Sequence, residues 1–144
     1  MSTIREVLNR KGGVVVTIGK DASVLEAISI MSDANIGAIV VLQDEIPTGI
    51  FTERDYLKKI ALKGRSSSNT RLYEVMSSPL ITVDPCDSLE TAMETMTACR
   101  CRHLIVSDGD VMHGIVSLGD IVKHLLVERE NEVEQLSHYI AGSY

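Results

Sequence analysis

GIFTERD at residues 49–55 and GIVSLGD at residues 114–120 share the form Gly-apolar-apolar-Thr/Ser-x-x-Asp. They lie 65 positions apart, and shifting the sequence by that distance aligns residues 17–60 with residues 82–125 without a gap. Identical or similarly apolar residues recur along the whole of this alignment. Self-similarity at a fixed spacing is typical of a duplicated structural unit. The sequence therefore predicts two copies of one unit.

Each copy predicts the order strand, helix, strand, strand, helix. A short apolar strand, VVVTI or LITV, precedes a helix whose apolar residues recur at spacings of three and four, as at Val24, Ala27 and Met31. Ser23 followed by Glu26 is typical of a capping box at the start of such a helix. A β-branched run, a polar turn and a second short strand follow, and the second helix begins at the Thr/Ser-x-x-Asp motif. We expect an α/β (α+β) fold of two β-α-β-β-α repeats with an additional C-terminal helix.

The repeats divide the chain into four segments. We assign residues 1–62 to the first repeat with a lead-in helix, 63–71 to a Ser-rich linker, 72–127 to the second repeat, and 128–144 to a helical extension. One apolar stripe runs along the C-terminal helix, at Val122, Leu126, Val133, Leu136 and Ile140. Either a partner chain or the same domain must cover such a stripe, and we expect a homodimer.

Composition narrows the classes of function. The chain has 144 residues, of which 44% are hydrophobic and 24% charged, as in a soluble globular domain. A net charge of -6 disfavours nonspecific nucleic-acid binding, which depends on a basic surface. We expect no membrane span and no export signal, and hence a cytoplasmic protein with its three cysteines reduced.

The repeated motif suits an anionic ligand that carries a ribose. Its Gly allows close approach of a ligand or a neighbouring backbone, and its hydroxyl lies beside the free N–H groups of a helix start. The Asp in the first turn can accept hydrogen bonds from two ribose hydroxyls. The structural alternative is that the Thr/Ser and the Asp only cap a helix. Two copies in register favour the ligand site.

Together with RHLIV at residues 102–106, these motifs resemble the tandem cystathionine-β-synthase-type repeat, the CBS pair or Bateman module. The resemblance covers nearly the whole chain and extends to small stand-alone bacterial proteins and plant organellar relatives. It implies two repeats packed with pseudo-twofold symmetry and adenine nucleotides in the clefts between them. The ligands known for the family are AMP, ADP, ATP, NAD(H) and S-adenosylmethionine.

The resemblance also implies that each cleft combines the Thr/Ser and Asp of one repeat with strand residues of the other. We therefore expect a primary nucleotide cleft formed by Thr52, Arg54, Asp55, Thr82, Arg102 and His103. The second cleft combines Thr17, Gly37, Ala38, Ser117 and Asp120. The first is ranked higher because Arg102 and His103 can bind phosphate, whereas Gly37 and Ala38 stand at the equivalent positions.

Besides phosphate binding by Arg102 and His103, the stretch CRCRH at residues 99–103 has two alternative interpretations, a metal site and a redox switch. Cys99 and Cys101 align with Ala34 and Ile36 of the first copy, and we therefore expect them to be buried packing groups. Three adjacent ligands along a strand make a poor metal site because strand side chains alternate in direction. We expect no bound metal, and surface positions for His113 and His124.

Catalytic motifs are not apparent in the sequence, and we do not expect an enzyme. The interpretation is a regulatory module that binds AMP, ATP or NAD(H) and signals energy or redox status to an unknown regulated protein. The alternatives are a thiol-redox sensor and a structural dimerisation module with vacant clefts.

Overall fold

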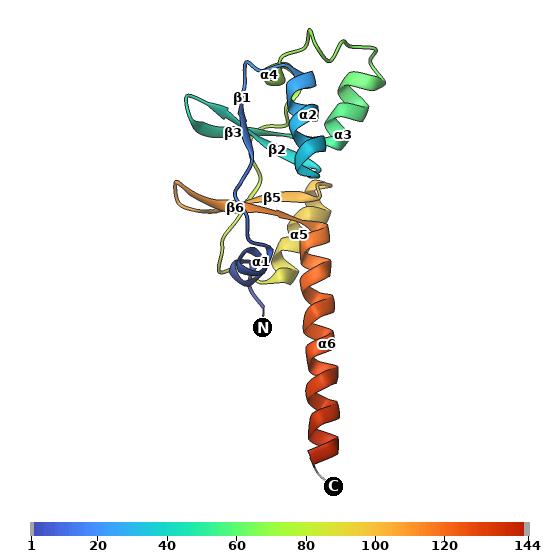
Figure 1. Ribbon diagram of the computed structural model, residues 1–144. Helices are drawn as coiled ribbons and strands as arrows, with labels where there is room; N and C mark the ends of the chain where they lie inside the picture. Colours follow the sequence, from blue (N-terminus) through green and yellow to red (C-terminus); the bar gives the residue numbers. More distant parts are fainter. Residues whose placement is uncertain (1, 143–144) are drawn as a thin grey trace. The chain divides into compact units, whose positions relative to one another are not determined.

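The computed structural model describes residues 2–142, and it confirms the mixed α/β fold with two three-stranded sheets (Figure 1). In the first half of the chain the elements are α1 (Ile4–Lys11), β1 (Thr17–Gly19), α2 (Val24–Ala34), β2 (Ala38–Gln43), β3 (Ile46–Thr52), α3 (Glu53–Asp55) and the π-helical turn η1 (Tyr56–Ala61). In the second half they are α4 (Leu72–Val75), β4 (Thr82–Val83), α5 (Leu89–Cys99), β5 (His103–Asp108), β6 (Val111–Ser117) and α6 (Leu118–Gly142). No helix in this range is long and apolar enough to span a membrane.

The chain forms two compact units whose boundaries differ from those of the sequence repeats. One unit contains residues Val14–Ile81, and the other contains the residues up to Gly13 together with those from Thr82 onward. We refer to them as the β1–β3 unit and the β4–β6 unit. The helix α1 precedes the first copy in the sequence, yet it belongs to the unit built on the second copy.

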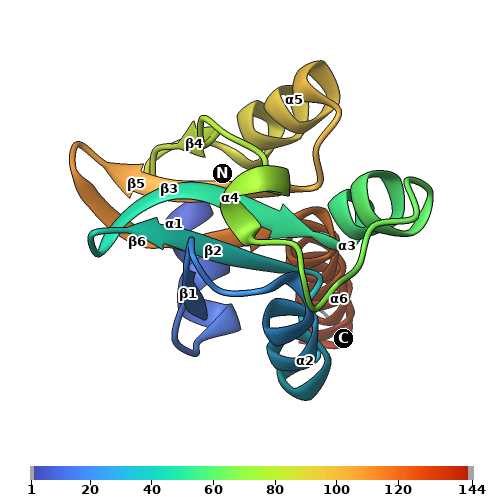
Figure 2. The same ribbon diagram turned by 90° about the horizontal axis from the view of Figure 1, so that it is seen from above.

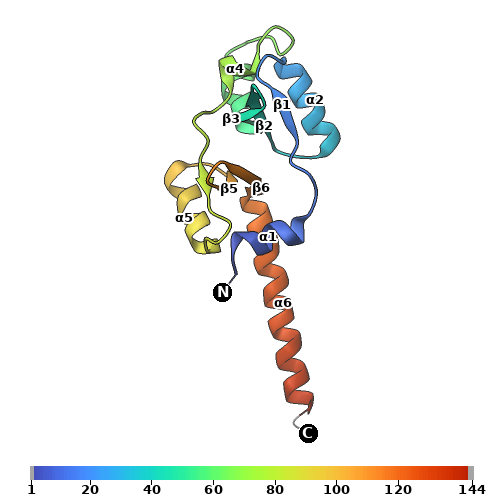
Figure 3. The same ribbon diagram turned by 90° about the vertical axis from the view of Figure 1, so that its left-hand side faces the viewer.

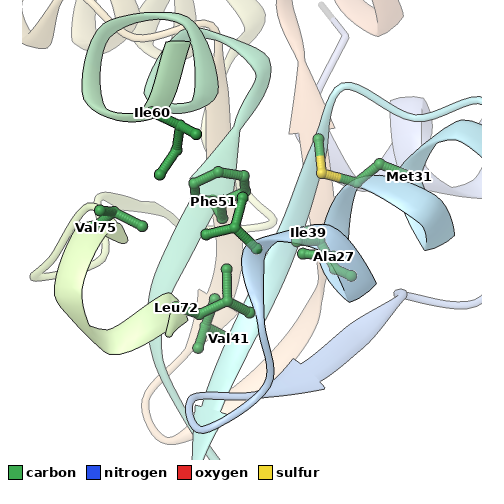
Figure 4. Packing of buried hydrophobic residues seen from close by; sticks show 9 residues of the cluster. Ala27, Met31, Ile39, Val41, Phe51, Ile60, Leu72 and Val75 are labelled. Atoms are coloured by element: carbon green, nitrogen blue, oxygen red, sulfur yellow. The ribbon is translucent and has the colours of Figure 1, made fainter. Parts of the chain in front are cut away.

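The β1–β3 unit has a sheet in which β1 runs parallel to β2, and β2 pairs antiparallel with β3. The helix α2 lies beside this sheet in Figure 2. Its buried residues share one hydrophobic cluster with Phe51 of β3 and with Leu72 and Val75 of α4 (Figure 4). The cluster comprises Val24, Ala27, Met31, Ile39, Val41, Phe51, Ile60, Leu72 and Val75. The helical spacing found in the sequence therefore marks the buried face of α2.

The β4–β6 unit repeats this sheet, with β4 parallel to β5 and β5 antiparallel to β6. Both hairpins carry an irregularity at matching positions, between Val41 and Leu42 and between Val106 and Ser107. In Figure 3, α1 lies against the N-terminal part of α6, and the C-terminal part of α6 extends beyond the sheet of this unit. The predicted C-terminal helix is therefore present, and its start coincides with the Ser-x-x-Asp motif of the second copy.

A short lead-in helix precedes each copy, α1 before the first and α4 before the second. Each lead-in helix closes the core of the other copy. The backbone N–H groups of Ile4 and Arg5 in α1 donate to the carbonyls of Asp87 and Pro85, at 3.0 and 2.9 Å. The same pair of bonds recurs in the β1–β3 unit, from Leu72 and Tyr73 to Ala22 and Lys20, at 3.0 and 3.1 Å. These bonds hold the buried side chains of the two lead-in helices in place, namely Ile4, Val7, Leu72 and Val75. Each copy is thus completed by a segment from elsewhere in the chain.

The first glycine of each repeated motif provides a test of this packing. A Cβ added at Gly49 would lie 2.6 Å from Met76 Sδ and 3.1 Å from the Ser77 carbonyl oxygen, whereas one at Gly114 would meet only the end of Leu8, at 3.0 Å. We expect Gly49→Ala to lower the free energy of unfolding by about 1 to 3 kcal/mol and Gly114→Ala to cost less, because a leucine side chain can shift.

Chemical denaturation of both variants measures this difference, and Gly19→Ala is the control because nothing lies within 4 Å of its added Cβ. A Gly114→Ala variant less stable than Gly49→Ala would contradict the assigned packing.

Candidate functional site

The Thr/Ser-x-x-Asp motifs form the same capping box at both strand-to-helix junctions. Asp55 N–H donates to Thr52 Oγ1 at 3.1 Å, and Thr52 N–H donates to Asp55 Oδ2 at 3.1 Å. In the second copy, Asp120 N–H donates to Ser117 Oγ at 3.0 Å, and Ser117 N–H donates to Asp120 Oδ2 at 2.9 Å. Each box satisfies two backbone donors at a helix start. The structural role considered for the motif is therefore present in both copies.

In the β1–β3 unit the predicted site residues gather at one end of the sheet. Ala38 pairs with Thr52 across β2 and β3, and the Gly37 carbonyl accepts a hydrogen bond of 3.1 Å from Glu53 N–H. Thr17 lies on the neighbouring strand β1, paired with Val40. Arg54 is exposed in α3, between the two partners of the capping box.

In the β4–β6 unit the equivalent positions gather in the same way. His103 pairs with Ser117 across β5 and β6, and the Arg102 carbonyl accepts a hydrogen bond of 2.8 Å from Leu118 N–H. Thr82 pairs with Ile105 on the adjacent strand. Arg102 and His103 therefore lie at the strand-to-helix junction that carries Asp120, within one unit. Their combination with Thr52 and Asp55 into a primary cleft stays a prediction, as does the second cleft.

Asp55 is buried, and its carboxylate forms an ion pair with Lys59 in the same helical segment. Asp55 is 6% exposed, and its Oδ1 accepts from Ser77 Oγ at 2.9 Å and lies 3.0 Å from Lys59 Nζ. Lys59 Nζ also donates to the Val75 carbonyl at 2.9 Å. Sequence analysis did not identify Lys59 or Ser77. The spacing of four residues between Asp55 and Lys59 was the available signal, because such pairs face each other on a helix.

The carboxylate of Asp120 carries a cation from a distant element. Lys11 Nζ, at the end of α1, lies 2.8 Å from Asp120 Oδ2 and donates to the Ile115 carbonyl at 2.9 Å. Burial acts to raise the pKa of Asp120, but the hydrogen bond and charge of Lys11 and the N–H of Ser117 together hold that pKa below its ordinary value. Nothing in the local sequence indicates Lys11, since the contact is long-range.

His124 is buried, so its expected surface position is wrong, whereas His113 is exposed as expected. His124 is 3% exposed, and its Nδ1 accepts a hydrogen bond of 3.1 Å from Arg10 Nε. Its Nε2 lies 3.2 Å from Glu128 Oε1 and 4.0 Å from Glu6 Oε2. The ring therefore joins α1 to α6 inside the β4–β6 unit.

Glu6, His124 and Glu128 also bring three potential metal-ligand atoms within 4.8 Å of one another. A neutral imidazole binds metal through an unprotonated nitrogen. Because Nδ1 accepts from Arg10, the proton of the neutral ring lies on Nε2, the nitrogen that faces both carboxylates. This arrangement suits an N–H donor to Glu128 and disfavours a metal ligand.

The thiols of CRCRH are less buried than expected. Cys99 is exposed and Cys101 is half-buried, so the expectation of buried packing is wrong for Cys99 and only partly met by Cys101. Burial and then the neighbouring Cys99 raise the pKa of Cys101. A thiol with a raised pKa is less often in the reactive thiolate form at neutral pH.

A family model for the CBS domain matches residues 4–62 and 72–127. The chain belongs to the CBS domain family. It is 38% identical over 152 residues to the mitochondrial CBS domain-containing protein CBSX3 of Arabidopsis thaliana, over 99% of this chain and 74% of the relative.

Solved structures of CBS-domain proteins share its fold. One with CBS domains from Burkholderia ambifaria matches with a TM-score of 0.84 and 37% identity, over 88% of this chain and 95% of that one. The hexameric CBS-CP12 protein from bloom-forming cyanobacteria matches with a TM-score of 0.76 and 29% identity, over 85% of this chain and 70% of that one. A CBS-domain pair is consistent with a regulatory module.

The Lys11–Asp120 ion pair predicts a stability change in acid. Because the pKa of Asp120 in the folded protein lies below the ordinary value of 3.8, its carboxylate stabilises the fold fully above that value. This contribution is lost as the pH falls through the lowered pKa. Wild type should exceed Asp120→Asn in unfolding free energy at neutral pH, and the difference should shrink at pH values below 3.8.

Urea denaturation at each pH measures this difference, with Asp110→Asn in an exposed turn as the matched control. A difference between wild type and Asp120→Asn that grows toward low pH would contradict the assigned ion pair.

Proposed function

We propose that this CBS-domain protein is a non-catalytic regulatory module that binds an adenine nucleotide at its strand-to-helix junctions and reports occupancy to a partner protein. The observation that carries the proposal is the capping box repeated at both junctions, each with a carboxylate held by a lysine. A purely structural cap needs no lysine. A ribose hydroxyl, which both donates and accepts hydrogen bonds, can replace the ammonium as a partner of the carboxylate.

The proposed division of roles follows from the chemistry of each group. Asp55 and Asp120 accept hydrogen bonds from ribose hydroxyls, and Thr52 and Ser117 supply a hydroxyl at a helix start. Arg102 and His103 supply cations for phosphate, and an Arg guanidinium binds phosphate with two parallel hydrogen bonds. AMP, ATP and NAD(H) each offer both a ribose and phosphate.

Two alternatives compete with nucleotide binding. A thiol-redox sensor needs a thiolate, and the raised pKa of Cys101 disfavours one at that position. A structural module would use the junctions only as helix caps and would show no nucleotide binding. Thermal unfolding with and without nucleotide distinguishes this structural module from a nucleotide-binding module, because a ligand that binds the folded state raises the melting temperature of the protein.

In the proposed primary cleft, the effect of a substitution on affinity should depend on whether the altered residue binds the phosphate or the ribose of the ligand. Arg102→Ala should weaken AMP binding about 10- to 150-fold, the loss expected for a charge-assisted hydrogen bond, and should leave adenosine binding nearly unchanged. Asp55→Asn should weaken both ligands, because both carry a ribose. Isothermal titration calorimetry measures these affinities.

Asp120→Asn is the comparison variant, and its AMP affinity should fall less than that of Asp55→Asn. If Asp120→Asn abolishes AMP binding while Arg102→Ala leaves it intact, the two clefts are assigned in the wrong order. Thermal unfolding of each variant without ligand controls for loss of folding at these caps.

We also propose a homodimer that uses the exposed apolar stripe of α6. Val122, Leu126, Val133 and Leu136 are each 46 to 60% exposed, and their spacings of four, seven and three match one face of a coiled coil. The hexameric assembly of the cyanobacterial CBS-CP12 neighbour supports self-association as a property of related proteins. The side chain of Ile140, the last member of the predicted stripe, lies outside the described residues.

Leu136→Lys should therefore weaken the dimer by about 10-fold or more, because it places a charge in an apolar seam. Gln135→Lys, an exposed neighbour away from the stripe, is the matched control with the same added charge. Truncation after Val127 should weaken it further. Sedimentation equilibrium measures the association, and a wild-type protein that is monomeric at micromolar concentration would contradict the homodimer.

A further inference from the structure

The two candidate carboxylates are neutralised from different parts of the chain. Lys59 lies four residues after Asp55, so that ion pair is local to one helical segment. Lys11 reaches Asp120 from α1, a separate element before the first copy. In the shifted alignment, Lys59 corresponds to His124, whose ring is engaged with Arg10 and Glu128 instead. The cation at Asp120 therefore comes from α1, and the equivalent helix position carries a histidine that is engaged elsewhere.

Lys11 also takes over contacts that a different residue makes in the other unit. Ser77 N–H donates to the Ile50 carbonyl at 2.8 Å, and Ser77 Oγ donates to Asp55. Ile115 and Asp120 are the equivalent acceptors in the second copy, and Lys11 Nζ donates to both. A backbone amide within a bridge cannot leave without unpairing the strand. The flexible side chain of Lys11 can leave its two acceptors without unpairing a strand.

Exposure distinguishes the two carboxylates, although the two lysines are similarly exposed. The side chains of Asp120 and Asp55 are 23% and 9% exposed, and those of Lys11 and Lys59 are 35% and 39% exposed. A solute can reach the Lys11–Asp120 pair directly. Lys11 is the last residue of α1, and Gly12 and Gly13 follow it with φ values of +63° and +82°. These glycines end one compact unit, and Val14 begins the other.

We propose that Lys11 is a displaceable counter-ion of Asp120, which a phosphorylated ribonucleoside exchanges for its own groups. Resting on the nucleotide function proposed above, the exchange gives the ribose hydroxyls to Asp120 and the ligand phosphate to the released Lys11 ammonium. An uncharged nucleoside must break the ion pair without replacing it, so this site selects for phosphate. The release also frees the end of α1, immediately before the glycines that lead into the β1–β3 unit.

The test follows the backbone amides of Ser117 and Asp120 by NMR while adenosine or AMP is added to the full chain. Lys11→Met should bind adenosine more tightly than wild type, because no ion pair competes for Asp120. Its preference for AMP over adenosine should fall about 10-fold or more, because the phosphate loses its cation. Lys63→Met, an exposed lysine outside both junctions, is the matched control and should leave both affinities at these amides unchanged.

Hydrogen exchange at Gly12 provides a second readout, since its N–H donates to the Leu8 carbonyl at 2.9 Å at the end of α1. Adenosine should accelerate this exchange in wild type and not in Lys11→Met. If AMP shifts the Ser117 and Asp120 amides but Lys11→Met keeps the wild-type preference for AMP, the counter-ion role is overturned while nucleotide binding stands. If neither ligand shifts these amides or those of Thr52 and Asp55, nucleotide binding itself fails, and the counter-ion role with it.

Discussion

The backbone hydrogen bonds between each lead-in helix and the opposite copy are the interaction on which the rest of the structure depends. A β-α-β-β segment leaves one apolar face of its sheet and helix without cover, and the four-residue helix α4 has no stability of its own in water. The bonds from Leu72 to Ala22 and from Ile4 to Asp87 place the apolar lead-in residues on these faces. Because neither copy closes its own core, each depends on a lead-in segment that belongs to the other copy in the sequence.

This exchange explains why the strand-to-helix junctions are built so similarly. In the β1–β3 unit the segment after α4 runs beside Gly49, and in the β4–β6 unit α1 runs beside Gly114. Each of these segments supplies a polar group to the Asp of the motif that contains the glycine. In the β1–β3 unit that group is the hydroxyl of Ser77, and in the β4–β6 unit it is the ammonium of Lys11. The backbone is duplicated, and the two sites differ mainly in the side chains that the lead-in segments bring.

The sequence predicted most of the fold because repeats, alternation and capping residues are local signals. Ser23 caps its helix as its spacing indicates, accepting from Glu26 N–H. Asp87 with Glu90 suggested the start of the equivalent helix, but its cap is Ser88, which accepts from Thr91 N–H. The error at Cys99 arose because an apolar residue at the matching position was taken as buried. Ala34 is itself exposed, at the end of α2, so the alignment was right and the assumed burial was wrong.

The parts of the site that sequence analysis missed depend on contacts between distant segments. His124 is buried only because α1 packs on α6 and brings Arg10 to its ring. Lys11 arrives at Asp120 by the same packing, yet in the sequence it is one of several lysines outside any motif. No periodicity indicates which copy a lead-in helix will join, because both copies present the same backbone acceptors.

Lys11 changes the basis on which the two predicted clefts are ranked, because it places a cation at the Asp120 site. Ranking by sequence compared Arg102 and His103 with Gly37 and Ala38, and so gave the Asp120 site no cation. An ammonium is present there, but it neutralises the carboxylate that would bind ribose. At Asp55 the ion pair lies within one helical segment, and the half-buried Ser77 hydroxyl that joins it comes from a backbone fixed by its bridge to Ile50. At Asp120 the same chemistry would disturb α1, which makes this site the better placed of the two to change the rest of its unit.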